Sequence, residues 1–424
     1  MNQLITVLFT FTALIVSAQE PITLQQCLEL AKSHDQQLVS EKAKLEKSVL
    51  DKAFHKWSLL PDLSSSIGFN TSFGRRLDPI TNTFATKSVN SQSFGLSSNL
   101  VLFSGGKFVY QKQLYDLAIQ QNTLSYEAKE NERTIQLIET YTELCKLSIQ
   151  TKLSESRIEN YLQLQEIQRL LVSAGKINAI DTLRTHNSVL SEQLLIENLR
   201  NNFHLTSIEF NYQLGVPLSS RYVFVETSIS AITLKPVFTE TFTIASIDND
   251  LQIQNEQLNM EKSSLLPRLS LAGTMGTGFS TNNKDYASEG SPTIPFHNQF
   301  SKNIYEGIGI YLSIPIFSKG TWLKARKMNA IVQHELTLTK DQAILALEKR
   351  RLETEQEILA QKTQIILQEK SASNFELIYA KSLLLYQEGR MSYSEMETAF
   401  LEWQVKMVEV EVLKLNHQKS LLYN

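Results

Sequence analysis

The chain of 424 residues contains little cysteine, proline and glycine, and no apolar run long enough to cross a membrane as a helix. Its two cysteines, Cys27 and Cys145, are too few for a disulfide framework or a zinc site, and each is expected to be a buried thiol. With 41 basic and 44 acidic residues the net charge is −3. That balance excludes a general attraction to nucleic acid or to an acidic membrane surface.

The few turn-forming residues are unevenly distributed. Twelve of the 15 glycines lie in two windows, 61–106 and 267–320. No proline occurs from 80 to 216, and none follows Pro315. A globular enzyme has loops at intervals of roughly 10–20 residues. The distribution therefore indicates long, uninterrupted helices rather than an enzyme domain.

The N-terminus has the pattern of a secretory signal peptide. Residues 4–16 are apolar, and the small residues Ser17 and Ala18 precede Gln19. This pattern predicts a signal peptide over 1–18 and therefore an exported protein without a lipid-attachment cysteine directly after the cleavage point. Since no Lys or Arg precedes the apolar run, an apolar first helix or a membrane anchor is the alternative.

Several landmarks occur twice in the sequence. They are Leu-Leu-Pro at 59–61 and 265–267, Phe-Ser-x-Gly at 103–106 and 317–320, and a glycine six residues before an acid at Gly175–Asp181 and Gly389–Glu395. Their repeated order predicts a tandem duplication. We expect a first repeat at 19–214, a linker at 215–240 and a second repeat at 241–424.

Each repeat contains stretches in which apolar residues alternate with small polar ones. The stretches are 63–74, 94–102, 269–279 and 308–316. Alternation over about ten residues predicts strands with one apolar and one polar face, and it matches tilted membrane strands. Ordinary amphipathic hairpins on a soluble domain are the alternative. The expected hairpins are 62–103 and 268–317, with polar, turn-rich loops at 75–93 and 280–303.

A long arm without proline follows each hairpin. Residues 107–174 and 321–388 are 68 residues each, and a continuous helix of that length measures about 100 Å. Their apolar residues recur at three-, four- and seven-residue spacing, as in coiled coils. Gly175 and Gly389 fit the residue after a helix end, where φ is positive. The arms therefore predict helix pairs at 107–214 and 318–424, and shorter helical arms precede the hairpins.

Four strands cannot close a barrel, and an open sheet edge is not tolerated in lipid. Either the strands lie outside a membrane, or several chains share one barrel. Two chains would give eight strands around a filled interior, and three would give twelve around a lumen.

Together these features resemble the TolC family of outer-membrane efflux proteins. The resemblance is carried by the signal peptide, the opening Ile22–Ala31, the repeated Leu-Leu-Pro and Phe-Ser-x-Gly motifs and the two glycine turns, and it covers essentially the whole mature chain. It implies a mixed α and β membrane protein, a homotrimer with a 12-stranded β-barrel in the outer membrane. A long α-helical coiled-coil barrel would continue the pore into the periplasm.

The resemblance also implies a function. The protein would be the outer-membrane channel of a tripartite efflux or type I secretion system and would conduct substrates passively. Its partners would be a periplasmic adaptor (membrane fusion) protein, an inner-membrane transporter and outer-membrane lipid. The sequence favours none of drug, metal or protein as the cargo.

In the family the two glycine turns form the periplasmic tip, which meets the adaptor and closes the resting duct. The corresponding residues here are Ala174, Gly175, Lys176, Glu388, Gly389 and Arg390. A plain helix C-cap is the alternative interpretation of each glycine.

The resemblance assigns roles to two acids near the tip. Three copies of Glu395 would form a carboxylate ring facing the lumen, which favours cations. A second acid is common one turn later, but Thr398 stands there, so a weaker ring is expected. Asp181 matches an acid that, in the family, pairs with a basic residue and keeps the tip closed. Met391 stands at the position of that basic residue, so Arg390 is the candidate to pair with Asp181 instead. Solvated helix faces are the alternative for both acids.

Two tryptophans are candidates for the membrane interface. Trp57 and Trp322 lie just beyond the predicted strands, on the periplasmic side. Membrane barrels carry an aromatic girdle at this level. Core packing at the junction of strands and helices is the alternative.

No catalytic, cofactor-binding or metal-binding residue is expected. The seven histidines are scattered, and no phosphate-binding loop or nucleophile elbow is present. Nucleic acid is not an expected partner. A non-pore periplasmic coiled-coil scaffold or surface stalk is the alternative function, and it explains the helices but not the duplicated strands. An exported enzyme would explain only the signal peptide.

Overall fold

A computed structural model describes residues 21–78, 80–85, 88–224 and 236–423. The signal peptide expected at 1–18 lies outside these residues. The chain forms two compact units. Unit 1 contains the residues up to Lys42, Ser125–Ile244 and the residues from Gln342 onward, and unit 2 contains Ala43–Leu124 and Ala245–Asp341.

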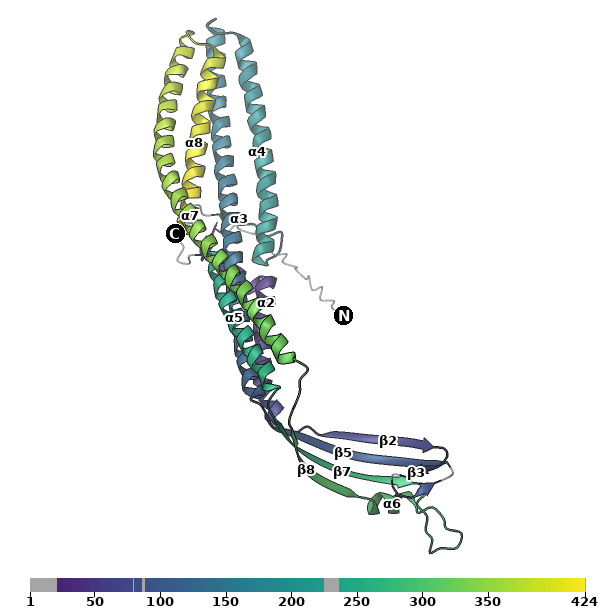
Figure 1. Cartoon of the computed structure of the whole chain (residues 1–424). Coiled ribbons are helices and arrows are strands. Elements are labelled where there is room, and N and C mark those ends of the chain that lie inside the picture. Colours follow the sequence, from purple (N-terminus) through teal and green to yellow (C-terminus); the bar gives the residue numbers. More distant parts are fainter. Residues whose placement is uncertain (1–20, 79, 86–87, 225–235, 424) are drawn as a thin grey trace, which may run out of the picture. The chain divides into compact units, whose positions relative to one another are not determined.

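Long helices dominate unit 1. They are α3 (Lys107–Ser173), α4 (Ala179–Leu214), α7 (Thr321–Gln387) and α8 (Tyr393–Leu421), of which α3 and α7 also contribute to unit 2. In unit 1 they lie side by side, with both helix-to-helix turns at the same end (Figure 1). The predicted helix pairs are therefore present, because no proline or glycine interrupts either arm.

One buried cluster of unit 1 gathers around a small parallel sheet, near the ends of α4 and α8 that lie away from the two turns. Strand β1 (Pro21–Ile22) pairs with β6 (Val223–Phe224), and helix α1 (Leu24–His34) follows β1. The Tyr141 hydroxyl donates to the Ile22 carbonyl over 3.0 Å and its ring packs against Phe224. Cys27 and Cys145 lie in this core as thiols, both fully buried. The expectation of buried thiols is confirmed.

A buried ion pair fixes the end of α1 in this core. The Arg133 guanidinium pairs with the Asp35 carboxylate, and both side chains are almost inaccessible to water. The second Asp35 oxygen accepts from the Gln37 backbone amide, at the start of α2 (Gln36–His55). Since each charge is satisfied by the other, removal of either partner would leave an unpaired buried charge.

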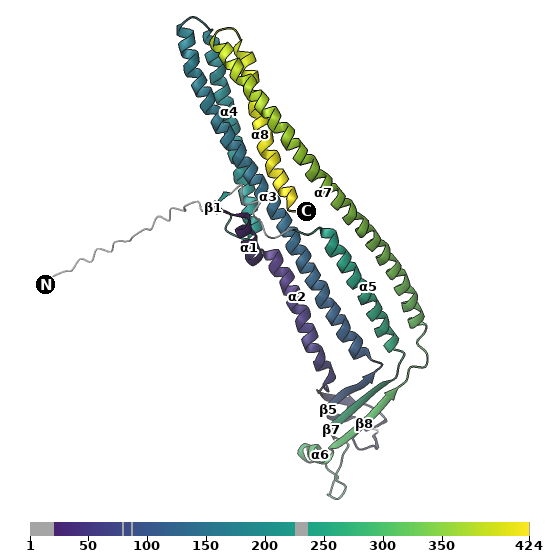
Figure 2. The same cartoon turned by 90° about the vertical axis from the view of Figure 1, so that its left-hand side faces the viewer.

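In unit 2, four helical segments stand in one row, α2–α3–α5–α7 (Figure 2). Helix α5 is Thr239–Ser263, and a short 3₁₀ helix, η1 (Lys56–Leu59), follows α2. Polar contacts join the neighbours: Lys52–Asp116, Asn249 to the Leu117 carbonyl, and Asn329 to the Gln254 carbonyl. None of the described helices is long and apolar enough to cross a membrane.

Each helix of this row connects to one strand of a four-stranded antiparallel sheet. The strands are β2 (Ser64–Ser72), β5 (Val89–Ser104), β7 (Arg268–Ser280) and β8 (Tyr305–Ser313), in the order β2-β5-β7-β8. The register pairs Ile67 with Phe94, Leu96 with Met275, and Leu271 with Ile310. The strands of the two predicted hairpins thus lie in a single sheet.

The two faces of the sheet differ in chemistry. One face carries the large apolar residues, and most of them are exposed: Leu63, Ile67, Phe69, Phe73, Leu96, Met275, Ile308, Ile310 and Leu312. The other face is lined by small residues, such as Ser66, Ser93, Gly95, Thr274, Gly276 and Gly307. Because side chains alternate along a strand, the period of two in the sequence becomes these two faces.

The loops are more structured than their polar composition indicates. Within the expected loop 75–93, strands β3 (Arg76–Leu77) and β4 (Phe84–Ala85) form a small hairpin, and β5 already begins at Val89. Within 280–303 lies a short helix, α6 (Phe296–Lys302). The Asp78 carboxylate orders the first loop by accepting from the Ile80 and Thr81 amides and the Ser280 hydroxyl. This last bond joins residues 202 positions apart, which sequence pattern alone does not reveal.

Folded protein should not react with a maleimide at either native cysteine. Burial raises the pKa of the Cys27 thiol to about 12, so that at pH 8 about one molecule in ten thousand carries the reactive thiolate. Cys145 is equally inaccessible to solvent. Mass spectrometry should find both residues labelled only after denaturation. An Ala287→Cys variant, placed on an exposed loop, should label rapidly; labelling of the native protein at Cys27 would contradict the described core.

Candidate functional site

Two helix turns of the same construction lie at one end of unit 1. After α3, the Gly175 amide donates to the Val172 carbonyl (3.0 Å) and the Lys176 amide to the Leu171 carbonyl (2.9 Å). After α7, Gly389 and Arg390 make the equivalent bonds to Tyr386 and Leu385, both 2.9 Å. These are Schellman motifs, which need a residue with positive φ; the φ angles of Gly175 and Gly389 are 69° and 75°.

The helix that follows each turn is capped three residues after the glycine. Asn178 accepts from the Ile180 amide and caps α4, while Ser392 accepts from the Glu395 amide and caps α8. The Glu395 carboxylate in turn accepts from the Ser392 amide (3.0 Å) and hydroxyl (2.7 Å), which completes a capping box. These two bonds lower the pKa of Glu395 and so favour the ionised form of this exposed carboxylate.

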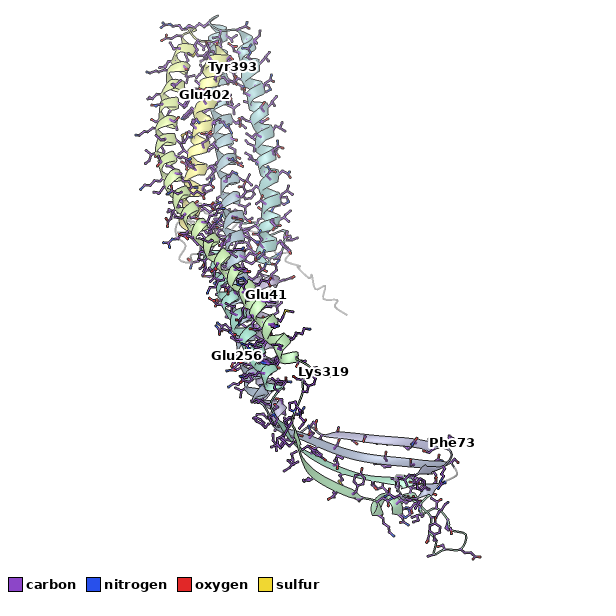
Figure 3. The ribbon with its side chains drawn as sticks, in the orientation of Figure 1. Glu41, Phe73, Glu256, Lys319, Tyr393 and Glu402 are labelled. Atoms are coloured by element: carbon purple, nitrogen blue, oxygen red, sulfur yellow. The ribbon has the colours of Figure 1, made fainter. Side chains whose placement is uncertain are left out.

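The two turns are in contact. A side chain at Gly389 would begin only 3.5 Å from the Lys176 carbonyl oxygen. The six predicted tip residues, Ala174 to Lys176 and Glu388 to Arg390, therefore form one surface, although more than 200 residues separate the two turns in sequence. Tyr393 lies close to this end of the helices (Figure 3). The surface consists of two tight turns that expose a lysine, an arginine and a glutamate.

Tyrosines from three helices pack beneath the turns. The cluster contains Tyr161 of α3, Tyr386 of α7, and Tyr393, Met396 and Phe400 of α8. Gln168 of α3 donates its amide to the Tyr386 hydroxyl over 3.0 Å, and burial raises the pKa of Tyr386 to about 12. Burial also raises the pKa of Tyr393. Both phenols are therefore neutral hydrogen-bonding groups that help to hold the helices together below the turns.

Glu397 joins α8 to α4 by a hydrogen bond that the sequence did not predict. Its carboxylate accepts from the Ser188 hydroxyl (2.5 Å) and from the Tyr393 hydroxyl (2.8 Å). Glu395 is two residues earlier, a rotation of about 200° on a helix, and points to solvent. In the sequence, only the spacing of four residues between Tyr393 and Glu397 hinted at a contact of Glu397, and this spacing does not identify Ser188 as its partner.

Asp181 and Arg390, the residues expected to latch the tip, do not pair with each other. Asp181 pairs with Arg184 on its own helix (3.6 Å), and Arg390 pairs with Glu388 (3.3 Å). Thr398 is exposed and donates its hydroxyl to the Ser394 carbonyl. Within one chain, the hydrogen bonds of Gln168 with Tyr386 and of Ser188 with Glu397 join helices below the turns.

A second buried charge pair lies further along α3 and α4. The Arg157 guanidinium lies 3.4 Å from the Glu192 carboxylate, and both side chains are nearly buried. Burial raises the pKa of Glu192, and Arg157 and Ser154 oppose that change. The Arg157 guanidinium also donates to the Ser154 hydroxyl. This pair lies inside the helix packing and therefore holds α3 against α4.

The two predicted interface tryptophans lie at the ends of the helical segments of unit 2. Trp57 is in η1, stacks on Phe54 and is 59% exposed. Trp322 is in the first turn of α7 and is half-buried. A tryptophan exposed to this extent has a face available for lipid, and within one chain Trp57 is not a core residue.

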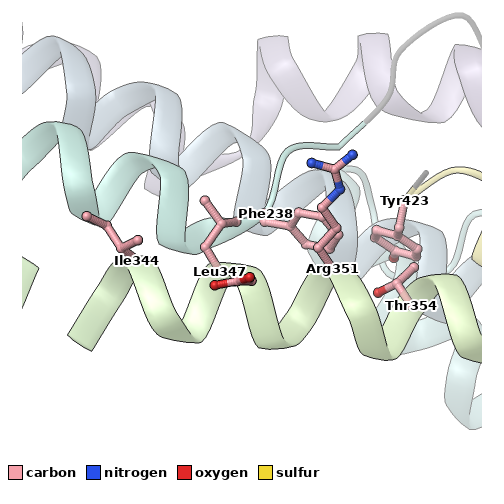
Figure 4. A pocket seen from close by; sticks show the side chains of 7 residues that line it. Phe238, Ile344, Leu347, Arg351, Thr354 and Tyr423 are labelled. Atoms are coloured by element: carbon pink, nitrogen blue, oxygen red, sulfur yellow. The ribbon is translucent and has the colours of Figure 1, made fainter. Parts of the chain in front are cut away.

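A groove of about 570 Å³ opens elsewhere in unit 1. Its lining residues are Phe238, Ile344, Leu347, Glu348, Arg351, Thr354 and Tyr423 (Figure 4). Apolar side chains contribute most of the lining surface, and the charged residues Glu348 and Arg351 lie among them. Across the described residues, no group of three or more potential ligands could hold a metal ion.

The comparisons with known proteins find matches among solved structures. No family model matches the chain, and no curated protein matches it at a significant level. Several solved structures of outer-membrane channels match nearly its whole length. CusC superimposes with a TM-score of 0.75 at 15% identity, over 96% of this chain and 91% of CusC.

Two further matches are also outer-membrane channels. The CmeC outer-membrane channel of Campylobacter jejuni gives a TM-score of 0.70 at 17% identity, over 94% of this chain and 84% of CmeC. The MtrE outer-membrane channel of Neisseria gonorrhoeae, in its open state, gives 0.69 at 12% identity, over 95% and 87%. The chain therefore has the fold of TolC-family outer-membrane channels, and the resemblance found in the sequence is confirmed for the fold.

The capping box can be tested by amide hydrogen exchange. A Ser392→Ala variant loses the capping hydroxyl, which costs helix ends about 1 kcal/mol. Exchange at the first amides of α8 should then become about fivefold faster. The bonds that Ser392 donates to Glu395 are strongest while the carboxylate is ionised, so in wild-type protein they should weaken as pH falls through the lowered pKa, below 4.5.

The matched control is Ser394→Ala, at an exposed position in the same turn of helix. It should leave exchange unchanged, because the Ser394 backbone carbonyl, and not its side chain, takes part in the described bond to Thr398. Equal protection in wild-type and Ser392→Ala protein would show that the cap does not form in solution.

Proposed function

We propose that this protein is an outer-membrane channel that assembles as a homotrimer and conducts exported substrates passively. Its four strands would form one third of a 12-stranded barrel in the outer membrane. Its helices would form one third of a helical duct in the periplasm. The observation that carries the proposal is a sheet with an exposed apolar face and two unpaired edges.

The exposed apolar face is nearly as tall as the apolar band of outer-membrane barrels. On β8 and the residues after it, exposed apolar positions run from Ile308 to Ile316, which is about 26 Å along an extended chain. A tilt of about 40° reduces this to about 20 Å, close to the roughly 25 Å of that band. Ile308 is 86% exposed and Phe69 is 73% exposed. A water-soluble protein rarely exposes such a large continuous apolar surface.

The edges of the sheet require further chains. Within the described residues, β2 pairs only with β5, and β8 pairs only with β7. Unpaired backbone groups are too costly in lipid for a spanning sheet to remain open. Because β2 and β8 are antiparallel in a four-stranded sheet, the β8 of one copy can pair with the β2 of the next. Three copies give twelve strands, a number that leaves a lumen.

Helix α7 carries an unpartnered stripe of the kind that holds coiled coils together. Its exposed apolar residues recur every seven positions: Ile331, Leu338, Leu345, Leu352, Leu359 and Ile366. A strict seven-residue repeat keeps one seam facing a neighbouring helix. A helix of a second copy would cover this seam, which supports the trimer independently of the sheet.

The small-residue face of the sheet suits a lumen. From Ser270 to Ser280 its positions on β7 hold serine, alanine, threonine and glycine and no charge. Small, neutral side chains leave space inside the barrel. The duct would therefore select little by charge in the membrane, and the acidic ring at Glu395 would set its preference for cations.

The other parts of the channel proposal concern the tip and its partners. The surface formed by the two glycine turns would meet a periplasmic adaptor, and an inner-membrane transporter would supply the energy. Glu395 would be the gate residue with Thr398 one turn later, and Asp181 would act in tip closure between copies. Trp57 and Trp322 would contact lipid at the periplasmic side. The protein would need no cofactor and would not be an enzyme.

The proposal includes an internal duplication, with repeats at 19–214 and 241–424 joined by 215–240. Helices α3 and α7 have 67 residues each, and both end in a Schellman motif followed three residues later by a helix cap. A non-pore scaffold or surface stalk is the second candidate. It would account for the helices, but it would leave the apolar face of the sheet in water.

The first test is the location and mass of the native protein. Mild detergent should extract it from purified outer membranes, and light scattering corrected for detergent should give three protomers of a chain whose precursor mass is 48.2 kDa. Recovery as a soluble monomer would remove the channel proposal and favour the scaffold.

The second test concerns the acidic ring. Glu395→Gln should reduce the preference for potassium over chloride severalfold, measured as a reversal potential across planar bilayers. Glutamine can also serve at this position of a capping box, so the variant removes charge and keeps the helix cap. The matched control is Glu197→Gln, whose charge Arg200 already neutralises; equal selectivity of all three proteins would remove Glu395 as the gate.

A further inference from the structure

The described strand β7 is longer than its neighbour β8, and helix α6 takes the place of the missing pairing. The last pair between β7 and β8 joins Gly276 to Tyr305, while β7 continues to Ser280. Gln299 of α6 accepts from the Ser280 amide and donates to the Ser280 carbonyl, both over 3.0 Å. Asn303, directly after α6, donates to the Gly278 carbonyl over 2.7 Å. Side-chain amides thus satisfy the backbone groups that a strand would otherwise pair.

These bonds hold α6 against the apolar face of the sheet. Thr277 and Phe94 are register partners on that face, and the Thr277 hydroxyl donates to the Phe300 carbonyl over 2.6 Å. Phe94 also makes edge contacts with Phe296 and Phe300, at centroid distances of 6.0 and 5.3 Å. The helix therefore lies on the same side of the sheet as Ile308 and Ile310.

Phe296 and Phe300 are only half covered by the sheet. They are 44% and 40% exposed, and they lie one helical turn apart. Ile304, which follows α6, is 48% exposed. On the remaining surface of α6, His297, Ser301 and Lys302 are exposed polar residues. The short helix is therefore amphipathic, with an aromatic side continuous with the apolar face of the sheet.

The apolar face becomes polar at the level of α6. Met275 pairs with Glu306, and Phe279 pairs with Gln92. Thr71 and Asn90, further toward the loops, pair through a side-chain hydrogen bond of 2.9 Å. A charged or amide side chain on a lipid-facing surface belongs outside the hydrocarbon, at the level of the headgroups. The hydrocarbon band would therefore end between Ile308 and Glu306, directly below α6.

We propose that α6 is an interfacial anchor that contacts membrane lipid on the outside of the sheet. Phe296 and Phe300 would lie at the boundary of acyl chains and headgroups, where aromatic residues are favourable, and Lys302 would approach lipid phosphate. This inference rests on the proposed membrane location of the sheet. It supplies the girdle at the loop-bearing end of the strands, opposite the end at which Trp57 and Trp322 lie.

Spin-label accessibility in lipid tests the anchor. Full-length protein carrying Phe300→Cys or Ile304→Cys is labelled with a nitroxide and reconstituted into vesicles of phosphatidylcholine with a minority of phosphatidylglycerol. The native cysteines are fully buried and should remain unlabelled. Collisions with oxygen report lipid, and collisions with a soluble nickel chelate report water. Ile304→Cys leaves the sequence of α6 intact, so it carries the test if Phe300→Cys does not fold.

Two control positions define the scale. Ile310→Cys, in the middle of the apolar band, should give the highest ratio of oxygen to nickel collisions. Ala287→Cys, on the exposed loop, should give the lowest. The ratio of oxygen to nickel collisions at 300 and at 304 should be severalfold lower than at 310 and severalfold higher than at 287, as expected for labels at the level of the headgroups.

Three results would overturn the anchor. Ratios at 300 and 304 equal to that at 287 would place α6 in water. Protection of both labels from oxygen and nickel would show that a neighbouring copy covers the helix. A low ratio at Ile310 would instead remove the membrane location of the sheet itself, and with it the proposed function.

Discussion

The open edges of the four-stranded sheet are the constraint on which this structure depends. Among the residues that the structure describes, no strand pairs with the outer edge of β2 or of β8, and the face between these edges exposes Ile67, Phe69 and Ile308. Water could satisfy the edges but would penalise the apolar face, whereas lipid favours the face but cannot satisfy the edges. The proposed closure by further copies would satisfy both. A helix of a further copy would also cover the exposed seven-residue stripe of α7.

The tip shows how short motifs build a surface from distant segments. Each turn is determined locally by a glycine with positive φ and a capping side chain three residues later. Their meeting is not local, because it depends on α3, α4, α7 and α8 packing around Tyr161, Tyr386 and Tyr393. Hydrogen bonds from Gln168 and to Glu397 then join the helices inside one chain. The helix that carries the exposed Glu395 is therefore held in position by contacts of Glu397, Tyr386 and Tyr393.

At the loop-bearing end of the sheet, side-chain amides pair with strand backbone that no neighbouring strand reaches. Where β8 stops short, Gln299 and Asn303 pair with the backbone of β7, and the helix that carries Gln299 covers part of the apolar face with Phe296 and Phe300. One short helix thus reduces the exposed edge and extends the aromatic surface. Asp78 orders the neighbouring loop between β2 and β5 by accepting hydrogen bonds from Ile80, Thr81 and Ser280. In both loops a few polar side chains fix the structure, although the composition of the loops predicts only turns.

The sequence by itself determined the elements whose signals are local and repeated. Absence of proline predicted the long helices, alternation predicted the strands and their two faces, and Gly175 and Gly389 marked the turns, because backbone sterics and side-chain period act between near neighbours. Tertiary structure alone decided which residues meet across the fold. The pairing of Asp78 with Ser280, of Glu397 with Ser188 and of α6 with β7 depends on contacts between segments that are distant in sequence or hidden in polar loops. A hydroxyl or an amide has many partners of equal chemistry in a chain, and only packing brings one of them within hydrogen-bonding distance.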